Sequence, residues 1–257
     1  MKLRLIGLDY PDDPHMNLAM DEAIFLEVMN GNSPPTFRFY RNSNAVILGC
    51  FQLAEEEVDI KYAIRNDIKI AKRFTGGGAV YHDMGNLNYS IISKDFNDIG
   101  MNVERLFSTM MKGAVRAFND MGLGGVSGGL NDVTVKSKKV LGSAATIRSG
   151  TVLFHAAILV NTNLDTLALV LKVPKIKLSD KGAQSILDRV TNIRDISGKD
   201  IVGVRNAILE GYSKELGFEY EEGNLTDREE ALLKRLYKEK YQRSDWNLGR
   251  EYITVNH

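Results

Sequence analysis

Three consecutive glycines are the feature of this sequence best suited to binding chemistry. Gly76, Gly77 and Gly78 follow Arg73 and precede His82, so side chains that donate hydrogen bonds flank them. Each glycine costs about 0.5–1 kcal/mol relative to alanine in a regular element, so a run of three is hard to explain by folding alone. Bare backbone between strands lets an anionic or flat ligand approach closely. A glycine-rich turn without a ligand explains the same residues, and both interpretations stay open on the glycines alone.

A second segment offers a lysine that a hairpin would hold in place. Val133 and Val135 alternate with polar residues, and residues 136–138 form a short turn before a second strand-like run, which predicts a β-hairpin. On the returning strand, Lys139 is expected on the same face as Leu141. A rigidly held ammonium suits the neutralisation of charge on a transferring phosphate and carboxylate. The alternative is a solvated lysine in a basic cluster.

Strand-like and helix-like patterns are interspersed along the chain, so the expected fold class is α/β or α+β. Helices are predicted at residues 18–30 with Asn17 as the cap, at 103–121, and after a capping box that begins at Thr226. Strands are predicted at residues 1–9, 68–71 and 79–81, and at 36–40 and 45–48, which we expect to pair around a turn at 41–44.

Taken together, the two chemical segments resemble the lipoate-protein ligases. Residues 73–83, with Lys72 before them, follow the family signature of a basic pair, two further residues, three glycines, a small residue, Val, an aromatic residue and His-Asp. Asn131-Asp132 followed by Lys139-x-x-Gly142-Ser-Ala144 resembles the family's second motif, in which the lysine is in the active site. Residues 154–193 also follow the family pattern, so the resemblance spans about residues 15–195.

The resemblance implies a fold and a reaction. The fold has mixed β-sheets flanked by helices and is related to biotin-protein ligases and class II aminoacyl-tRNA synthetases. Residues 1–257 would form one catalytic domain, with about 225–257 as a small helical appendage. The reaction uses ATP and Mg²⁺: the lipoate carboxylate attacks the α-phosphate to give lipoyl-AMP, and a carrier lysine then attacks this mixed anhydride. Activation is needed because a carboxylate is a poor acyl donor.

The resemblance also implies the site residues. The expected catalytic residue is Lys139, and Asp132 is the candidate metal ligand. The expected substrate and adenylate contacts are Arg73, Gly76, Gly77, Gly78, Val80, His82, Asn86, Asn131, Asp132, Lys139, Gly142 and Ala144. Tyr40 and residues 46–49 are candidates for the pocket of the dithiolane tail. Lys72 replaces the first arginine of the basic pair found in many relatives, which loses bidentate geometry.

The expected partners follow from the same resemblance. They are lipoate and the lipoyl carrier domains of 2-oxoacid dehydrogenase complexes and glycine cleavage H protein. The resemblance is strongest to short archaeal-type enzymes, in which a separate small protein supplies the C-terminal accessory domain of the longer ligases. Because the sequence ends at His257, we expect such an accessory protein here.

Composition is consistent with this interpretation. The 33 basic and 33 acidic residues give zero formal charge, so no global basic field favours nucleic acid. A single cysteine excludes an intrachain disulfide framework and fits a reducing compartment. No apolar run approaches the ~20 residues that span a bilayer. We therefore expect a cytoplasmic protein that binds neither membrane nor nucleic acid.

Two rival functions remain at this stage. An octanoyl- or lipoyl-transferase of the same fold would use a cysteine thioester near Asn131, where this sequence has none; its only cysteine is Cys50. A non-enzymatic binder of lipoate or an adenylate would be expected to lack Lys139. Ser127 lies in a Gly-x-Ser-x-Gly string, but a helix is expected before it and a strand after it, the reverse of a nucleophile elbow.

Overall fold

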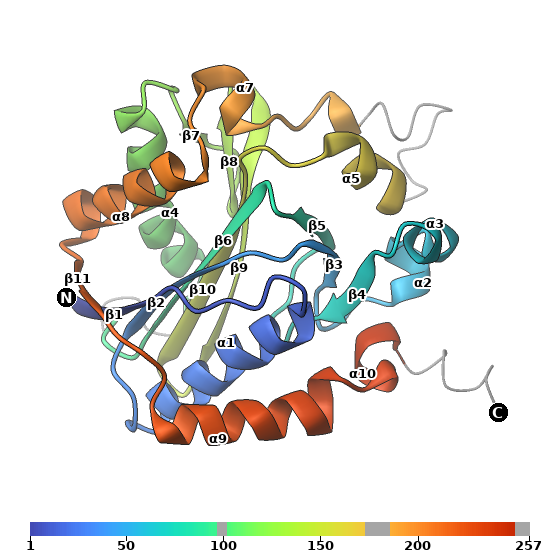
Figure 1. Ribbon diagram of the computed structural model, residues 1–257. Coiled ribbons are helices and arrows are strands. Elements are labelled where there is room, and N and C mark those ends of the chain that lie inside the picture. Colours follow the sequence, from blue (N-terminus) through green and yellow to red (C-terminus); the bar gives the residue numbers. More distant parts are fainter. Residues whose placement is uncertain (97–101, 173–185, 250–257) are drawn as a thin grey trace.

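A computed structural model describes residues 1–96, 102–172 and 186–249. Within these residues the strands form an eight-stranded mixed sheet and a separate three-stranded sheet, with helices packed around them (Figure 1). The predicted class of mixed sheets flanked by helices is confirmed.

The large sheet has the order β11-β1-β2-β6-β10-β9-β8-β7. Its strands are β1 (Lys2–Ile6), β2 (Thr36–Tyr40), β6 (Asn86–Ser93), β7 (Val126–Ser127), β8 (Asp132–Val135), β9 (Lys138–Arg148), β10 (Thr151–Leu159) and β11 (Glu219–Glu222). Strands β11, β1 and β2 run parallel to one another, and all later neighbours are antiparallel. The small sheet places β3 (Asn44–Leu48) between β4 (Lys69–Lys72) and β5 (Val80–Asp83).

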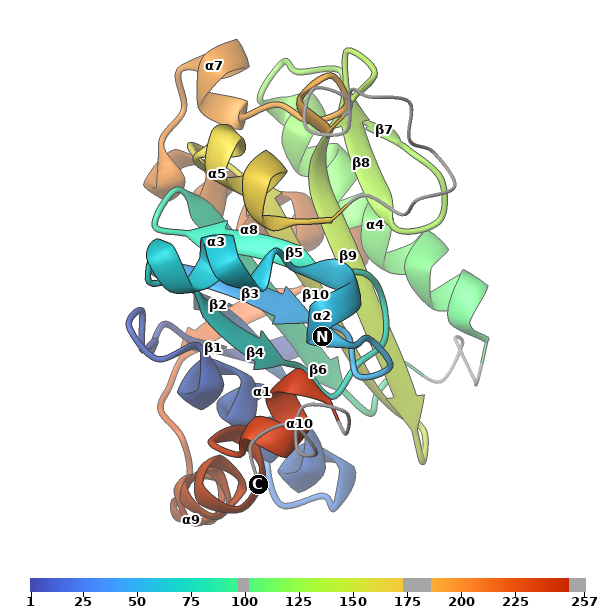
Figure 2. The ribbon, with the colours of Figure 1, turned by 90° about the vertical axis from the view of Figure 1, so that its right-hand side faces the viewer.

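Helices cover both faces of the large sheet. They are α1 (Pro14–Met29), α2 (Ala54–Glu57), α3 (Ile60–Arg65), α4 (Val103–Asp120), α5 (Leu164–Val170), α7 (Ile193–Ser197), α8 (Ile201–Leu216), α9 (Asp227–Leu236) and α10 (Ser244–Leu248), with a π-helical turn at Tyr237–Tyr241. Helices α4 and α8 pack together on one face, whereas α1 and the small sheet lie against the other (Figures 1 and 2).

Strand β6 divides these two layers. Its odd-numbered residues Leu87, Tyr89 and Ile91 belong to the apolar core that α4 and α8 complete. The alternate residues Asn86, Asn88 and Ser90 point to the opposite face, as strand geometry requires, and they are equally buried. The layer between the large sheet, α1 and the small sheet is therefore partly polar inside.

The predicted pairing of residues 36–40 with 45–48 is wrong. Strand β2 pairs with β1 and β6, while β3 pairs with β4 and β5 in the other sheet. In the link between them, the buried side chain of Asn42 is bonded to Asn17 and His82. The link therefore carries the chain from one sheet to the other.

The first helix begins four residues before the predicted start. Pro14 occupies the first turn, where its fixed φ is favourable, and the Asp13 carboxylate accepts from the Met16 backbone N–H. Asn17, predicted as the cap, lies inside the helix and uses its side chain elsewhere. The helix at residues 103–121 and the capping box of Thr226 with Glu229 are confirmed.

The C-terminal segment predicted as an appendage packs into a second buried apolar cluster, which also contains residues of α1. Leu232 and Leu233 of α9 pack against α1 in one buried cluster. Arg4 donates to both oxygens of Glu229, at 2.8 and 2.5 Å, and Tyr241 donates to Glu22. The C-terminal helices therefore complete the layer that holds α1; the rest of the predicted appendage, residues 250–257, lies outside the described residues.

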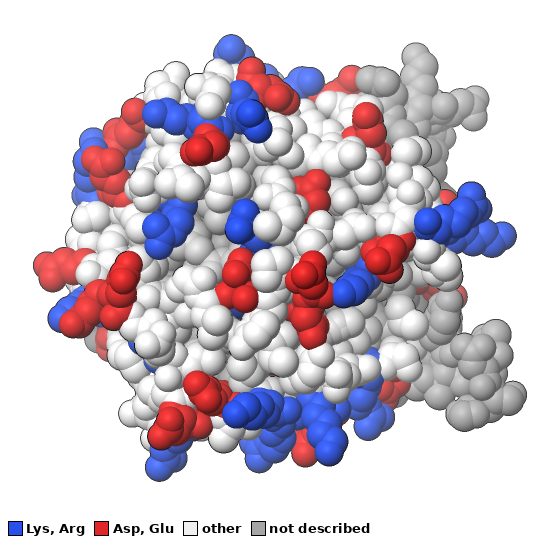
Figure 3. All heavy atoms as spheres, viewed as in Figure 1, with Lys and Arg blue, Asp and Glu red and all other residues white. Residues whose placement is uncertain are grey.

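Among the described helices, none combines the length and apolar character that a membrane span requires. Acidic and basic side chains are intermixed over the face in Figure 3, in keeping with the zero formal charge.

Two ion pairs between the N-terminal strand and the C-terminal segment give a matched test. Glu229→Ala should lower the free energy of unfolding by about 3 kcal/mol, because it leaves the largely buried guanidinium of Arg4 without its partner. Glu221→Ala removes the exposed pair with Lys2 and should lower the free energy of unfolding far less, because solvent screens that pair. Urea unfolding measures the free energy of unfolding of both variants. Equal decreases would show that the C-terminal segment is not held by Arg4.

Candidate active site

Two adjoining cavities open between the sheets. The first has a volume of about 110 Å³, and Leu18, Tyr40 and Ile47 are among the residues that line it. The second, of about 350 Å³, is lined mainly by apolar residues, among them Leu141 of β9, Leu159 of β10 and Leu167 of α5. Both cavities are lined by Gly78, Ala79, Val80, Lys139, Gly142 and Ala157, so they meet at these residues.

Most of the predicted site residues converge on these cavities. The first is lined by Arg73, Gly78, Val80, His82, Asn131, Lys139, Gly142 and Ala144. The second adds Asn86. Three predicted residues line neither cavity: Gly76, Gly77 and Asp132. Of the residues suggested for the tail pocket, Tyr40 and Ile47 line the first cavity, whereas Val46, Leu48 and Gly49 do not.

Arg73 organises the glycine loop from within. Its guanidinium donates to the carbonyl oxygens of Gly76 and Gly78, at 2.7 and 2.9 Å, and also to that of Ile47. Burial lowers its pKa to about 10, so it remains charged at neutral pH. Arg73 therefore holds the loop carbonyls in this structure, instead of presenting free donors to a ligand as the sequence suggested.

The structure gives a reason for glycine at only one of the three loop positions, Gly77. Gly77 has φ of 95°, a conformation that strains other residues, and its carbonyl oxygen would lie 2.1 Å from a Cβ at Gly49. Gly78 has open space where a side chain would begin. The loop can therefore approach Gly49 closely and leave room beside Gly78.

Lys139 is fixed by a hairpin and a further contact. Lys136 and Ser137 both have positive φ and form the tight turn between β8 and β9, which confirms the predicted hairpin. The Lys139 backbone N–H donates to Arg189 and its carbonyl accepts from Thr191. Both sides of the Lys139 backbone are thus bonded, so the base of its side chain is held firmly.

A bulge in the hairpin determines which way Lys139 points. Lys139 pairs with Thr134, but Leu141 pairs with Val133, so Val140 has no opposing residue. Adjacent residues of β8 face opposite sides, and hence Lys139 and Leu141 do not share a face as predicted. The bulge buries both Val140 and Leu141 in the core and turns Lys139 toward Asp132, with Nζ and Oδ1 2.7 Å apart.

Two buried histidines also line the first cavity. Burial lowers the pKa of His82 to about 3, and the positive charge of Arg73 acts in the same direction. Burial lowers the pKa of His155 well below its usual value as well. A hydrogen bond of 2.8 Å joins His155 Nε2 and Thr75 Oγ1. Both rings are therefore neutral at physiological pH.

Asn88 is a residue of the cavity that the sequence reasoning missed. It lies on β6 between Tyr40 and Ala157, lines the first cavity and is 1% exposed, yet neither atom of its amide has a partner among the described residues. The polar residues at 86, 88 and 90 recur every second position in an otherwise apolar strand. That alternation was a signal that could have identified Asn88.

Cys50 and Lys72 lie away from the two cavities. They line a separate groove with Phe51 and Trp246. Burial lowers the pKa of Lys72. Neither residue lines the two cavities that meet at Lys139.

Residues 13–211 match the family model described as lipoyl protein ligase A/B catalytic domain. The chain therefore belongs to this family. A similar relative is lipoate-protein ligase A subunit 1 of Thermoplasma acidophilum, 42% identical over 97% of each chain. Octanoyltransferase LipM of Clostridioides difficile is 31% identical, over 91% of this chain and 94% of that protein. Proteins similar to this chain thus include one named as a ligase and one named as an octanoyltransferase.

Solved structures show the same architecture. The bipartite lipoate protein ligase of T. acidophilum, described with its E2 lipoyl domain, has a TM-score of 0.90 at 43% identity, covering 97% of each chain. A lipoate-protein ligase A bound with ATP has a TM-score of 0.87 at 39% identity, covering 97% of this chain and 99% of that one. The T. acidophilum protein Ta0514 with bound lipoic acid has a TM-score of 0.86 at 37% identity, covering 97% and 100%.

The contact between Gly49 and the glycine loop predicts the effect of a methyl group. Gly49→Ala should destabilise the protein by about 1–3 kcal/mol, because the added Cβ overlaps the Gly77 carbonyl. Gly7→Ala is the matched control, since a Cβ there meets no atom within 4 Å, and it should change stability by less than about 0.5 kcal/mol. Thermal unfolding of the two variants measures the difference; an unaffected Gly49→Ala protein would contradict this packing of the loop.

Proposed function

We propose that this chain is the catalytic subunit of a lipoate-protein ligase. It activates lipoate with ATP and transfers the lipoyl group to a lysine of a lipoyl carrier domain. The observation that carries the proposal is the position of Lys139 where two cavities meet, with the only cysteine of the sequence lining a different groove. Relatives bound with lipoic acid and with ATP support it. We further propose that residues 1–257 form one catalytic domain and act in the cytoplasm.

The sizes of the cavities suggest how they divide the substrates. The narrow first cavity, with Leu18, Tyr40 and Ile47 at its apolar side, suits the slender acyl chain. The larger second cavity suits the nucleotide. In this arrangement the carboxylate and the α-phosphate meet beside Val80, Lys139 and Gly142.

The chemistry then follows from the position of the ammonium. A carboxylate oxygen forms a bond to the α-phosphorus as the bond to the β-phosphate oxygen breaks and pyrophosphate leaves. Negative charge gathers on the phosphoryl oxygens, and the Lys139 ammonium neutralises it in a partly buried site. A lysine amine next attacks the acyl carbon, the bond to the phosphate oxygen breaks, and AMP leaves.

We further propose a magnesium ion held jointly with the nucleotide by Asp132, which lines neither cavity but pairs with Lys139 where they meet. Mg²⁺ is commonly bound by one or two carboxylates together with substrate phosphates. Among the described residues, no group of three His, Cys, Asp or Glu side chains forms an all-protein metal site, and Asp132 is a carboxylate within reach of Lys139. We propose that Asp132 would hold the ion, which would add charge neutralisation on the phosphates.

The octanoyltransferase alternative requires a thiol at the acyl carbon. Cys50 lies two residues after β3, in the groove with Phe51 and Trp246, and it lines neither cavity. A thioester formed on its sulfur would not lie beside Lys139. The position of Cys50 therefore favours the adenylate route.

Lys139→Ala is expected to lower ATP–pyrophosphate exchange by at least a hundredfold while leaving thermal unfolding unchanged. The loss of a preorganised charge contact typically costs about 3–4 kcal/mol in the transition state. Cys50→Ser, measured in the same assay, should keep most activity. More than about a tenth of normal exchange in Lys139→Ala would refute the role of Lys139, and acyl transfer from Cys50 without ATP would favour the rival reaction.

We also propose that the chain works with a separate small accessory protein. The T. acidophilum relative is a subunit of a bipartite ligase, and this chain is similar to it along 97% of its length. Adding the accessory protein to the purified chain should increase lipoylation of a carrier domain by at least about tenfold, since closure around substrate completes such sites. Co-elution of the two proteins is the parallel measurement. Full turnover by the chain alone, unchanged by the partner, would contradict the proposal.

A further inference from the structure

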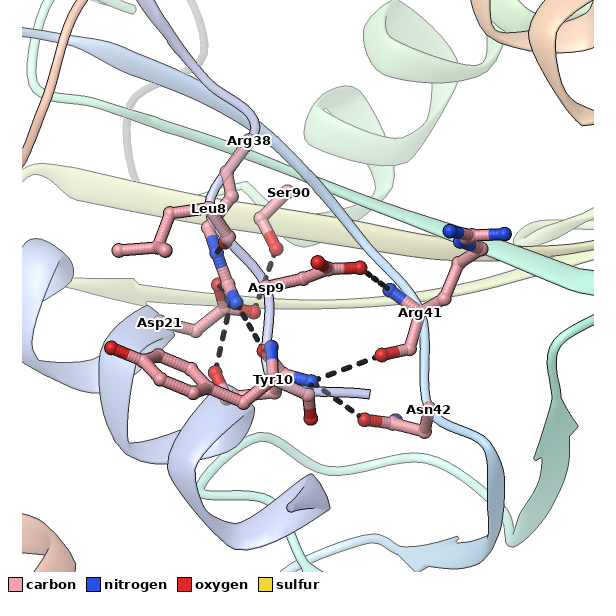
Figure 4. Close-up of polar contacts among 9 residues, drawn as sticks. Leu8, Asp9, Tyr10, Asp21, Arg38, Arg41, Asn42 and Ser90 are labelled. Atoms are coloured by element: carbon pink, nitrogen blue, oxygen red, sulfur yellow. Dashed lines mark hydrogen bonds and ion pairs between the residues drawn. The ribbon is translucent and has the colours of Figure 1, made fainter. Parts of the chain in front are cut away.

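A buried chain of hydrogen bonds leads from Arg38 on β2 to His82 on β5. Arg38 is fully buried and pairs with Asp21 of α1 at 2.7 Å, while Ser90 donates to the other oxygen of Asp21 (Figure 4). Arg38 also donates to Asn17 Oδ1 at 2.6 Å, and Asn17 Nδ2 donates to Asn42 Oδ1 at 2.8 Å. Asn42 Nδ2 then lies 3.0 Å from His82 Nδ1.

Arg38, the first residue of this series of hydrogen bonds, determines which atom donates in each of the others. A guanidinium donates and never accepts, so the Asn17 atom beside Arg38 is the oxygen. The other end of Asn17 faces the carbonyl oxygens of Tyr10 and Arg41, which only accept, and must be the NH₂ group. Asn42 consequently presents its oxygen to Asn17 and its NH₂ group to His82.

This order determines where the proton of His82 lies. Nδ1 accepts from Asn42, so it carries no hydrogen, and the hydrogen of the neutral ring is on Nε2. Nε2 is buried and has no partner among the described residues, and His82 lines the first cavity. A buried N–H without a partner is destabilising, and a bound acceptor would remove that cost.

We propose that Asn42 is a positioning residue that holds His82 as the Nε2–H tautomer, so that this N–H donates a hydrogen bond to the carboxyl oxygen of the bound acyl substrate. The choice of acceptor rests on the proposed function. Lipoate has one strong acceptor group, its carboxylate, and its sulfur atoms accept only weakly. The same N–H then continues to bond that oxygen after it becomes part of the acyl phosphate.

One consequence concerns the second half-reaction. His82 has one ring nitrogen occupied as an acceptor from Asn42 and the other already protonated. It therefore has no free lone pair to take a proton from the attacking lysine. His82 acts as a fixed donor and not as a general base.

The tautomer can be measured without substrate. Two-bond ¹H–¹⁵N NMR spectra of the uniformly ¹⁵N-labelled chain distinguish a protonated from an unprotonated ring nitrogen, and the His82→Gln variant assigns the His82 signals among the four histidines. We expect an unprotonated Nδ1 and a protonated Nε2. A protonated Nδ1 in the wild-type protein would overturn the proposal, whatever the activity of the protein.

Substitutions at Asn42 then connect the tautomer to activity. Asn42→Asp keeps an acceptor for Asn17 but offers only oxygen to His82, so the NMR signature should show a protonated Nδ1, and kcat/KM for exchange should fall about tenfold to a hundredfold. Asn42→Ala should release the ring and cause a smaller loss. Asn119→Asp, an exposed amide-to-carboxylate change on α4, should alter neither the tautomer nor the rate.

The tautomer of His82 and its role in activity can be tested separately. If Asn42→Asp keeps the wild-type tautomer, or reverses it with no loss of exchange, the proposal fails. If Asn42→Asp does not fold, the wild-type spectrum and Asn42→Ala still decide. Absence of lipoate-dependent exchange in the wild-type protein would remove the proposed function while leaving the tautomer measurement to stand by itself.

Discussion

The structure depends on the burial of polar side chains between its two sheets. Asn86, Asn88 and Ser90 of β6 face the layer closed by α1 and the small sheet, and each must find a partner there or lose stability. Ser90 bonds to Asp21, but atoms of Asn86 and Asn88 remain without partners among the described residues. An unpaired buried polar group costs about 1–3 kcal/mol, so this layer is less stable than an apolar one would be. A ligand that supplies the missing partners would recover part of that cost.

The rest of the chain is arranged to keep this polar layer in place. Arg38 bonds α1 to β2, and α9 packs on the outer side of α1, where Glu229 holds Arg4. The link between the two sheets contributes Asn42, whose side chain connects this network to His82. The site therefore lies where the two sheets meet, and stability and function involve some of the same side chains.

Much of the fold was predictable because local signals agreed with it. The capping box of Thr226, the apolar stripe of α4 and the turn at Lys136 and Ser137 depend on neighbouring residues only. The pairing of β2 with β3 was mispredicted because the strands that they actually pair with lie elsewhere in the sequence: β1 and β6 for β2, and β4 and β5 for β3. The side of the strand on which Lys139 lies was mispredicted, because the alternation of side chains along a strand cannot reveal the bulge at Val140.

The candidate site, too, was predictable where local sequence motifs identify it and not where distant contacts decide it. The glycine run and the motif around Lys139 identified the segments that meet at the cavities, and most of the named residues line them. The sequence could not show that Arg73 bonds the loop carbonyls, since those contacts arise only when the loop folds over its side chain. Nor could it show that Asn17 and Asn42 lead to His82, because the three residues come from different elements.

The central claim is that the two cavities beside Lys139 bring a carboxylate to the α-phosphate of ATP. The most direct measurement is ATP–pyrophosphate exchange by the purified chain, alone and with its accessory protein, in the presence and absence of lipoate. The account predicts exchange that requires lipoate and does not require a carrier protein. Acyl transfer from a carrier without ATP, with no lipoate-dependent exchange under either condition, would contradict it.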